Sequence, residues 1–546
     1  MIKKLILTFC CTVSLHAWAQ ITIKNPILQG FYPDPSIERV GDDYYLINST
    51  FAYFPGLPIF HSKDLKNWKL VGHAIERPGQ FDFKGHRTSE GLFAPAISYH
   101  EGRFYVVCTN VRWGNFVVTA ENPAGPWSDP VKLPEVSGID PSVCFIDGKA
   151  YIVYNSEAPD NKPLYDGHRT IRIVDFDYKN LKVTSEPKIL VNGGVDLSRK
   201  PVWIEGPHLF KRENYYYLSA AEGGTSVNHS QVIFRSDKPT GPFRPWDKNP
   251  IMTQRDLDPD RPKPVTSTGH ADLFIGPDNN WYAVYLAVRP YEGNHYNTGR
   301  ETFISPVTWT ADGWPVIIPK GEEVKYSYTF KWKEQPLKDT YPLNGNFSYK
   351  ADFKHPDNSF IFLRDYDPGM FSTGKKGLKI NLKPAAIHEK EASAFVGRRL
   401  MHMYAGFKTS FDFTPASENE DAGIVLYQSD WNTYYAAKTL KNGRQVIELR
   451  KSKRNGSYDI LASENLQGGK PLNLWIDFAA DKLTFSYSEG KEKTRVLAAG
   501  VDARHLSTET AGGFVGVTIG MYGSSNGQPS HNSVTFKTFE YQGNDH

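Results

Sequence analysis

Short apolar runs separated by polar turns dominate the chain from residue 20 to about residue 325. Five segments follow one pattern of an apolar run, a Gly, Asp or Asn turn, and an aromatic-rich run, which is typical of a β-hairpin. They read DPSIERVGDDYYLI from Asp34, APAISYHEGRFYVV from Ala94, DPSVCFIDGKAYIV from Asp140, GPHLFKRENYYYLS from Gly206 and HADLFIGPDNNWYAVY from His270. Their spacing, roughly 46 to 66 residues, leaves room for four strands in each unit. The pattern predicts an all-β, five-bladed β-propeller over residues 20–325.

In a propeller the first strand of each blade lines the central channel, so the residues that lead these strands meet at one mouth. The leading residues are Asp34, Ala94, Asp140, Glu205 and His270, with Glu205 one position earlier than the others. Four of these five residues are titratable. We therefore expect a cluster of ionisable side chains at one end of the channel.

The hydrophobic pattern changes after the fifth unit. Residues 326–340 are charged and loop-like, which predicts a linker. Beyond them, segments such as GFKTSFDFTP and LWIDFAADKLTFSYSEG alternate apolar and polar residues, as two-sided strands do. Residues 341–546 are predicted to form a β-sandwich of the jelly-roll or concanavalin-like type.

The first 19 residues have the pattern of a secretory signal peptide. Lys3 and Lys4 precede an apolar stretch, and Ala17-Trp18-Ala19 places small residues where a signal peptidase cleaves. We expect cleavage before Gln20 and an exported protein, either periplasmic or secreted.

Composition narrows the function classes. The net charge of +3 is spread without long runs, which gives no support for binding to nucleic acid or insertion into a membrane. Aromatic residues make up 14% of the chain, with 30 Tyr and 12 Trp. Flat sugar faces stack on aromatic rings, so this content in an exported all-β protein favours sugar handling, although large β folds are also rich in aromatic residues.

Hydrolysis of a glycosidic bond requires two carboxyl groups, one protonated and one ionised. Asp34 or Asp140 alone reads as an ordinary turn residue, and His270 or Arg300 alone as a core or surface side chain. Glu205 lies in the apolar run VWIEGPHLF, where a carboxyl group is costly unless it is paired or functional. The shared register of the three acids favours the functional interpretation.

At these residues the chain resembles glycoside hydrolase family 43, in particular its β-xylosidases with a C-terminal β-sandwich. The similar blocks, in order, are NPILQGFYPDPS, STFAYFPGLPIFHSKDLKNW, GLFAP, GIDPSVCF, EGPHLFK, TGHADLF and GRET, followed by FVGRRL and NEDAGIVLYQ. The resemblance covers essentially the whole chain after the signal peptide.

The resemblance implies roles by position. Asp34 matches the general base, Glu205 the general acid, and Asp140 the aspartate that orients the acid and tunes its pKa. Sugar-binding positions are matched by Phe51, Phe93, His270 and Arg300. Phe93 stands where many relatives have Trp, which bears on the width of the pocket. The reaction requires no cofactor, and in some relatives the matching histidine helps to hold a water or metal ion, so the resemblance allows a structural Ca²⁺ near His270.

The implied function is an inverting exo-acting hydrolase that releases xylose from the non-reducing ends of β-1,4-xylo-oligosaccharides, including those derived from arabinoxylan. The alternatives are an α-L-arabinofuranosidase or a dual enzyme, an invertase-type hydrolase, and a non-catalytic sugar-binding propeller. Glu205 precedes Gly206 rather than Cys, which disfavours the invertase type. The segment ETAGGFVG is our hypothesis for the sandwich loop that closes the pocket.

Overall fold

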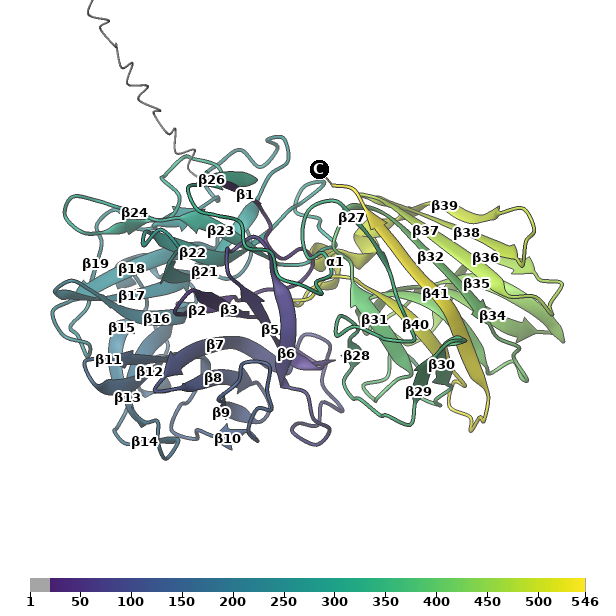
Figure 1. Ribbon diagram of the computed structural model, residues 1–546, viewed down its shortest axis with the longest axis horizontal. Helices are drawn as coiled ribbons and strands as arrows, with labels where there is room; N and C mark the ends of the chain where they lie inside the picture. The colour runs from purple at the N-terminus through teal and green to yellow at the C-terminus, as the bar shows by residue number, and fades with distance from the viewer. Residues whose placement is uncertain (1–19, 546) are drawn as a thin grey trace, which may run out of the picture.

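The computed structural model describes residues 20–545, and the predicted signal peptide lies outside this range. Figure 1 shows two β-rich units side by side, one coloured purple to teal and the other green to yellow. In the described range the only α-helix is the single turn α1 (Thr508–Ala511), accompanied by three short 3-10 segments, Pro159–Asn161, Leu197–Arg199 and Ala503–Leu506. None of these helices is long and apolar enough to cross a bilayer.

The first unit is built from five sheets of three to five strands. Sheet one contains β2 (Ser36–Val40), β3 (Asp43–Ile47), β5 (Gly56–Ser62) and β6 (Lys69–Ile75). Sheet two contains β7 (Leu92–His100), β8 (Arg103–Asn110), β9 (Gly114–Ala120) and β10 (Val131–Lys132). Sheet three contains β11 (Ile139–Ile146), β12 (Lys149–Glu157), β13 (Arg169–Asp177), β14 (Lys182–Val183) and β15 (Lys188–Asn192). Sheet four contains β16 (Glu205–Arg212), β17 (Tyr215–Glu222), β18 (Ser230–Ser236), β19 (Arg244–Pro245) and β20 (Met252–Thr253). Sheet five contains β21 (Thr266–Ile275), β22 (Trp281–Val288) and β23 (Glu301–Pro306).

The first strands of the five sheets contact one another in a cyclic order. β2 contacts β7 and β21, β11 contacts β7 and β16, and β16 contacts β21. All five also line a common cavity of about 720 Å³. The five hairpins predicted from the sequence are therefore present, and their first strands line one cavity.

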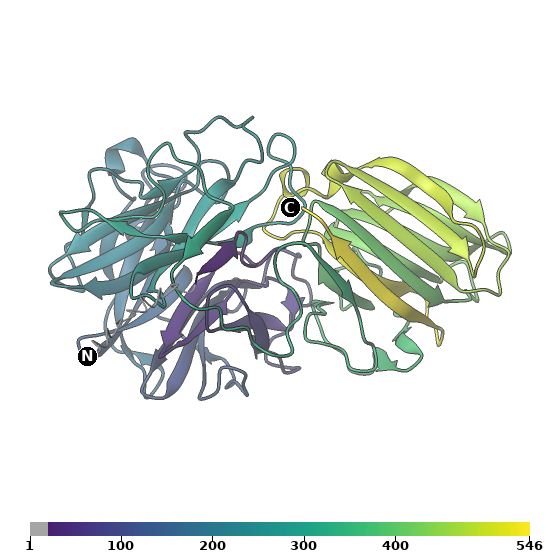
Figure 2. The same ribbon diagram turned by 45° about the horizontal axis from the view of Figure 1, so that its top comes forward.

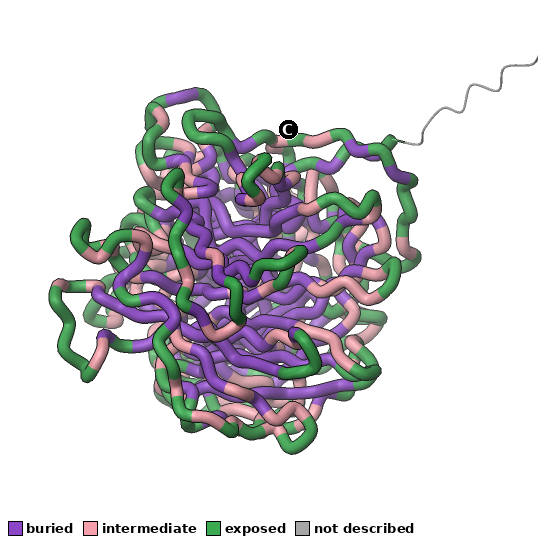
Figure 3. The backbone as a smooth tube through the Cα atoms, turned by 90° about the vertical axis from the view of Figure 1, so that its left-hand side faces the viewer, coloured by how far each residue is buried: buried purple, intermediate pink, exposed green. Residues whose placement is uncertain are grey.

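Each sheet packs on both of its faces, and the side chains of its central strands show this directly. Along β12, Tyr151 and Val153 join a hydrophobic cluster shared with sheet four, whereas Ile152 and Tyr154 join one shared with sheet two. Because successive side chains of a strand point to opposite faces, a strand buried on both faces must be continuously apolar. This explains the unbroken apolar runs that follow each turn. Figure 3, which views the unit from its outer side, shows a buried interior surrounded by exposed loops.

The segment predicted as a linker is partly ordered against the first unit. β26 (Ser327–Phe330) pairs antiparallel with β1 (Ile21–Lys24), and the rings of Phe330 and Trp332 stack 4.5 Å apart in the core. The charged residues gave this segment a loop-like appearance, but the apolar residues that alternate with them anchor it. Two short pairs, β24 (Thr308–Trp309) with β25 (Pro315–Val316) and β4 (Tyr53–Phe54) with β28 (Phe362–Leu363), lie outside the five sheets.

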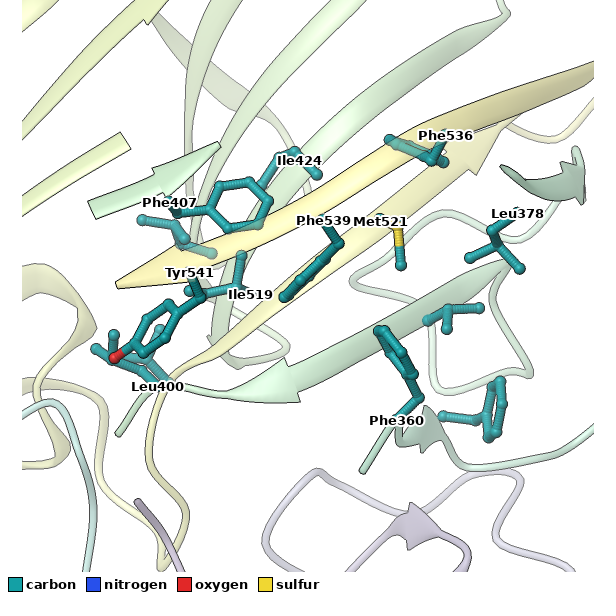
Figure 4. Packing of buried hydrophobic residues seen from close by; sticks show 14 of the residues in the cluster. Phe360, Leu378, Leu400, Phe407, Ile424, Ile519, Met521, Phe536, Phe539 and Tyr541 are labelled. Carbon is teal, nitrogen blue, oxygen red and sulfur yellow. The ribbon is translucent and has the colours of Figure 1, made fainter. Parts of the chain in front are cut away.

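The second unit is a sandwich of two antiparallel sheets, seen as stacked layers in Figure 2. The eight-stranded sheet contains β27 (Phe347–Lys350), β29 (Phe371–Gly374), β30 (Gly377–Asn381), β32 (Tyr404–Asp412), β37 (Leu472–Ala479), β38 (Lys482–Glu489), β39 (Arg495–Asp502) and β41 (Ser533–Gly543). The six-stranded sheet contains β31 (Phe395–Arg399), β33 (Asp421–Ser429), β34 (Asn432–Lys441), β35 (Arg444–Ser452), β36 (Tyr458–Asn465) and β40 (Thr518–Ser524). Alternate residues of facing strands, such as Phe407 and Phe539 on one sheet and Ile519 and Met521 on the other, fill the space between them (Figure 4).

The two units share a packed interface. Phe362 and Leu363 of β28 pair with Phe54 and Tyr53 of β4, so a strand pair joins the units. At the opposite end of the chain, Asp545 accepts a hydrogen bond of 2.8 Å from the buried Arg289 of the first unit. The C-terminus accordingly lies between the units in Figures 1 and 2.

Candidate active site

The first residue of each of the five repeated segments has the same unusual backbone conformation. The φ angles are 51° at Asp34, 35° at Ala94, 54° at Asp140, 56° at Gly206 and 53° at His270. In sheets two to five the strand register also shifts next to these positions, as at a β-bulge. A bulge bends the strand and redirects a side chain, and bulges are frequent beside active sites. The repeat seen in the sequence is therefore also a repeat of backbone geometry, which brings the starts of the five segments to one mouth.

That mouth holds a cavity of about 360 Å³. The structure brings together there all seven site residues predicted from the sequence, namely Asp34, Phe51, Phe93, Asp140, Glu205, His270 and Arg300. The cavity is small and largely apolar, with a few convergent polar groups, as expected of a small-molecule site.

Asp34 is held as an ionised carboxylate. Its Oδ2 accepts a hydrogen bond of 2.6 Å from Ser49 Oγ, which itself accepts one of 2.7 Å from the backbone N–H of Ala94. Its Oδ1 lies 3.2 Å from Arg300 Nη1. Burial by itself raises the pKa of Asp34, but the charge of Arg300, the contribution of His270 and the Ser49 hydrogen bond together lower it below its usual value.

Asp140 lies behind the backbone that carries Glu205. Its N–H donates to Thr109 Oγ1 at 3.2 Å, and its Oδ2 accepts a hydrogen bond of 3.2 Å from the N–H of Gly206. Burial and the negative charge of Asp34 raise the pKa of Asp140 to about 7. Asp140 is thus positioned to influence both the geometry and the charge of the neighbouring glutamate.

Glu205 has the opposite electrostatic surroundings to Asp34. It is only 9% exposed. Burial, followed by the charges of Asp140 and Asp34, raises the pKa of Glu205 well above its usual value, and Arg300 offsets this only in part. Two carboxyl groups in one cavity, one favouring the ionised form and one the protonated form, are suited to paired acid and base chemistry.

Two histidines lie close to this acid cluster. His270 Nδ1 is 3.8 Å from Asp34 Oδ1, and burial lowers the pKa of His270 to about 4. Behind it, His229 faces Ser267 O at 3.0 Å, and burial lowers the pKa of His229 to about 3. Both imidazoles are therefore neutral at neutral pH, and Arg300 is the permanent cation beside Asp34.

An aromatic wall bounds one side of the cavity. The ring of Phe51 lies 5.4 Å from that of Phe93 and 5.9 Å from that of Phe514. Phe93 and Phe514 meet edge to face at 5.6 Å, and the guanidinium of Arg300 lies 5.1 Å from the Phe514 ring. Phe514 belongs to the segment ETAGGFVG of the sandwich, so the hypothesised loop does line the cavity.

Sequence reasoning missed several residues that line or support the cavity. Thr225 accepts a hydrogen bond of 2.9 Å from Arg300, Ser49 orients Asp34, and Trp203 lines the cavity two residues before Glu205. Ser49 and Thr225 have no distinctive sequence signal because they follow strands as ordinary loop residues do. Trp203 did have a sequence signal, since it is a bulky aromatic residue two positions before a candidate acid.

The described side chains do not by themselves form a calcium site near His270. In residues 20–545, no group of three or more His, Cys, Asp or Glu side chains is arranged to hold a metal ion. Ca²⁺ takes six to eight oxygen ligands. The carboxylate beside His270 is that of Asp34, which is already engaged by Ser49 and Arg300. We therefore assign no chemical step to a metal.

Comparison with known proteins agrees with this arrangement. Residues 23–315 match the model of glycosyl hydrolases family 43, and residues 350–542 match that of the beta xylosidase C-terminal concanavalin A-like domain. The chain is 38% identical to a non-reducing end alpha-L-arabinofuranosidase of Bacteroides ovatus over 96% of this chain and 95% of the relative. It is also 38% identical to a xylosidase/arabinosidase of Butyrivibrio fibrisolvens over 95% of this chain and 99% of the relative.

A solved structure, that of xylan beta-1,4-xylosidase from Bacillus halodurans, superposes with a TM-score of 0.86 at 30% identity, covering 95% of this chain and 100% of that one. The family resemblance inferred from the ordered motifs is thereby confirmed. The chain belongs to family 43 of the glycosyl hydrolases and ends in the concanavalin A-like domain of its β-xylosidases.

Proposed function

We propose that this protein is an exported, inverting exo-glycosidase that releases xylose from the non-reducing ends of β-1,4-xylo-oligosaccharides. The observation that carries the proposal is the meeting of Asp34, Asp140 and Glu205 in one small cavity, with opposite pKa shifts at Asp34 and Glu205. The five sheets are proposed to be the blades of a propeller over residues 20–325. The cyclic contacts of their first strands support this architecture.

In the proposed mechanism Glu205 is the general acid. Its raised pKa keeps a proton available at neutral pH, and it gives this proton to the glycosidic oxygen as the bond to the anomeric carbon breaks. Asp34, which stays ionised, takes a proton from a water molecule. The oxygen of that water bonds to the anomeric carbon from the opposite side, so the configuration inverts. Asp140 orients Glu205 and helps to keep it protonated.

The other cavity residues are proposed to bind the sugar. Phe51, Phe93 and Phe514 provide flat apolar surfaces for its faces, and Arg300 provides hydrogen-bond donors for its hydroxyl groups. His270 lies beside Asp34, where its neutral ring can accept or donate one hydrogen bond. A cavity closed on one side by the sandwich favours removal of a terminal sugar over cleavage within a chain.

α-L-Arabinofuranosidase activity is the second candidate function, alone or combined with xylosidase activity. The Bacteroides ovatus relative is named an arabinofuranosidase and the Butyrivibrio fibrisolvens relative is named for both sugars. A non-catalytic sugar-binding role is disfavoured, because a binding protein has no need of a buried glutamic acid with a raised pKa.

Product analysis tests the proposal. Purified protein is given xylobiose, xylotriose and arabinan-derived oligosaccharides, and the first-formed sugar is followed by NMR. We expect xylose to appear first as its α anomer from a β-xyloside. Xylose appearing first as the β anomer would make Asp34 a nucleophile, and release of arabinose alone would favour the second candidate.

Export is tested separately by mass spectrometry of the protein recovered outside the cytoplasm. Cleavage before Gln20 is the expected result, and an intact Met1 would contradict it.

A further inference from the structure

Trp203 forms a cavity wall that is separate from the aromatic wall of the three phenylalanines. The backbone N–H of Trp203 donates to the backbone oxygen of Gly167 at 2.8 Å. The φ of 59° at Trp203 is unusual for a bulky residue. The neighbouring Val202 is 47% exposed, whereas Glu205 is 9% exposed. The chain therefore passes from the surface to the buried acid within four residues, and Trp203 lies at the mouth of the cavity.

A buried cation supports the indole ring. The guanidinium carbon of Arg169 lies 4.5 Å from the ring centroid of Trp203, although Arg169 is only 8% exposed. Its Nε and Nη2 donate to Asn155 Oδ1 at 3.2 and 2.9 Å, so it cannot move freely. A cation held over the face of an aromatic ring attracts it, which favours one orientation of the ring. The contact with Arg169 therefore restricts the indole.

The indole is also adjacent to the proposed acid. Both residues line the same cavity, and the side chain of Trp203, whose only donor is its Nε1–H, lowers the pKa of Glu205. A general acid must stand beside the glycosidic oxygen, between the sugar that is released and the sugar that leaves with the rest of the chain. A flat ring next to that acid, on the side of the cavity mouth, faces the leaving sugar.

We propose that Trp203, fixed by Arg169, is the platform on which the leaving sugar of an oligosaccharide stacks. This inference rests on the proposed function, because it assigns the group that receives the departing part of the same substrate. It makes Trp203 a residue that selects sugar leaving groups over other leaving groups.

The experiment compares two substrates that carry the same xylosyl group. Xylobiose has a sugar leaving group, and β-xylosyl fluoride has a single atom that needs no platform. For Trp203→Ala we expect kcat/KM on xylobiose to fall at least tenfold more than kcat/KM on the fluoride. For Trp203→Phe, which retains a flat ring, we expect most of the loss on xylobiose to be recovered. Equal losses on the two substrates, or a Phe variant as impaired as the Ala variant, would overturn the inference.

A matched control and a second measurement keep the test decisive. Trp475, in the sandwich, is also part-exposed and has Lys408 Nζ 5.7 Å from its ring, so Trp475→Ala should leave both activities unchanged.

If Trp203→Ala does not fold, the pH profile of the Trp203→Phe variant still tests the position of the indole. It lacks the indole N–H that stabilises ionised Glu205, so the alkaline limb of its profile should move to higher pH; an unmoved limb would contradict the placement of the indole. If the wild-type protein hydrolyses neither substrate, the proposed function itself fails.

Discussion

A glutamic acid in water is ionised at neutral pH, and Glu205 differs because of its burial and its two acidic neighbours. Asp34 experiences similar burial but has Arg300 and Ser49 as partners, so its pKa moves the other way. The division of roles proposed for these two carboxyl groups therefore depends on side chains that come from distant parts of the chain.

Replacing Glu205 by Ala should reveal the leaving-group dependence of a general acid. Activity on xylobiose should fall by about 10²- to 10⁴-fold, because a sugar alkoxide departs poorly without a proton. Activity on a nitrophenyl xyloside should fall much less, since that leaving group departs with little help. Steady-state kinetics on both substrates provides the measurement, and equal losses would exclude Glu205 as the proton donor.

Replacing Asp140 by Asn should change the pH dependence of kcat/KM. At pH values above about 7 Asp140 is largely ionised, and its charge opposes the ionisation of Glu205. Without that charge Glu205 loses its proton at lower pH, so the alkaline limb of the kcat/KM profile should move to lower pH. An alkaline limb that stays in place or moves upward would contradict the assigned coupling.

At the scale of elements, the positive-φ residue that begins each repeated segment, accompanied in sheets two to five by a shift of strand register, places the site residues at one mouth. Four of the five residues that begin the repeated segments are not glycine yet have φ near 50° or lower positive values, a conformation that most residues avoid. The fifth, Gly206, has a second reason to be glycine. A Cβ there would lie 2.7 Å from His270 Nε2.

Gly206→Ala should therefore destabilise the protein more than a comparable change elsewhere. The matched control is Gly148→Ala, at a turn with φ of 74° where a Cβ would meet nothing within 4 Å. Gly148→Ala should lower the free energy of unfolding by about 1 kcal/mol. Gly206→Ala should lower it by roughly 1–3 kcal/mol more, because its Cβ would contact His270. Denaturant unfolding measures both variants. Equal stabilities of the two variants would show that His270 moves aside without cost.

At the scale of the whole molecule, the sandwich is part of the site. Backbone groups of the two units approach closely here: a Cβ on Gly516 would lie 2.4 Å from Thr298 O, and the N–H of Val517 donates to Asn297 O at 2.8 Å. These contacts fix the loop that carries Phe514 beside the loop that carries Arg300. The catalytic unit alone would lack one wall of its cavity.

Phe514→Ala should raise KM for xylobiose about tenfold while changing kcat less, because the ring is proposed to bind the sugar and moves no proton. Thr510→Ala, an exposed position shortly before Phe514 in the same segment, is the control and should behave as wild type. Steady-state kinetics at fixed pH measures the effects on KM and on kcat separately. A variant with unchanged KM would show that the sandwich supports the fold only.

The sequence by itself determined the all-β class, the five hairpin-led units, the sandwich and the family. These features are local: strand periodicity, turn residues and ordered motifs are written in contiguous stretches of chain. Asp34, Asp140, Glu205 and His270 could be placed at one cavity because the repeat carries a constant backbone geometry, and Phe51, Phe93 and Arg300 because the ordered motifs resemble those of the family. Only the tertiary structure decided which groups shift the pKa values of Asp34 and Glu205, that residues 327–332 pack on the first unit, and that Trp203 lies on Arg169. Each of these depends on contacts between residues far apart in sequence, and no pattern along the chain records which distant side chain becomes the neighbour.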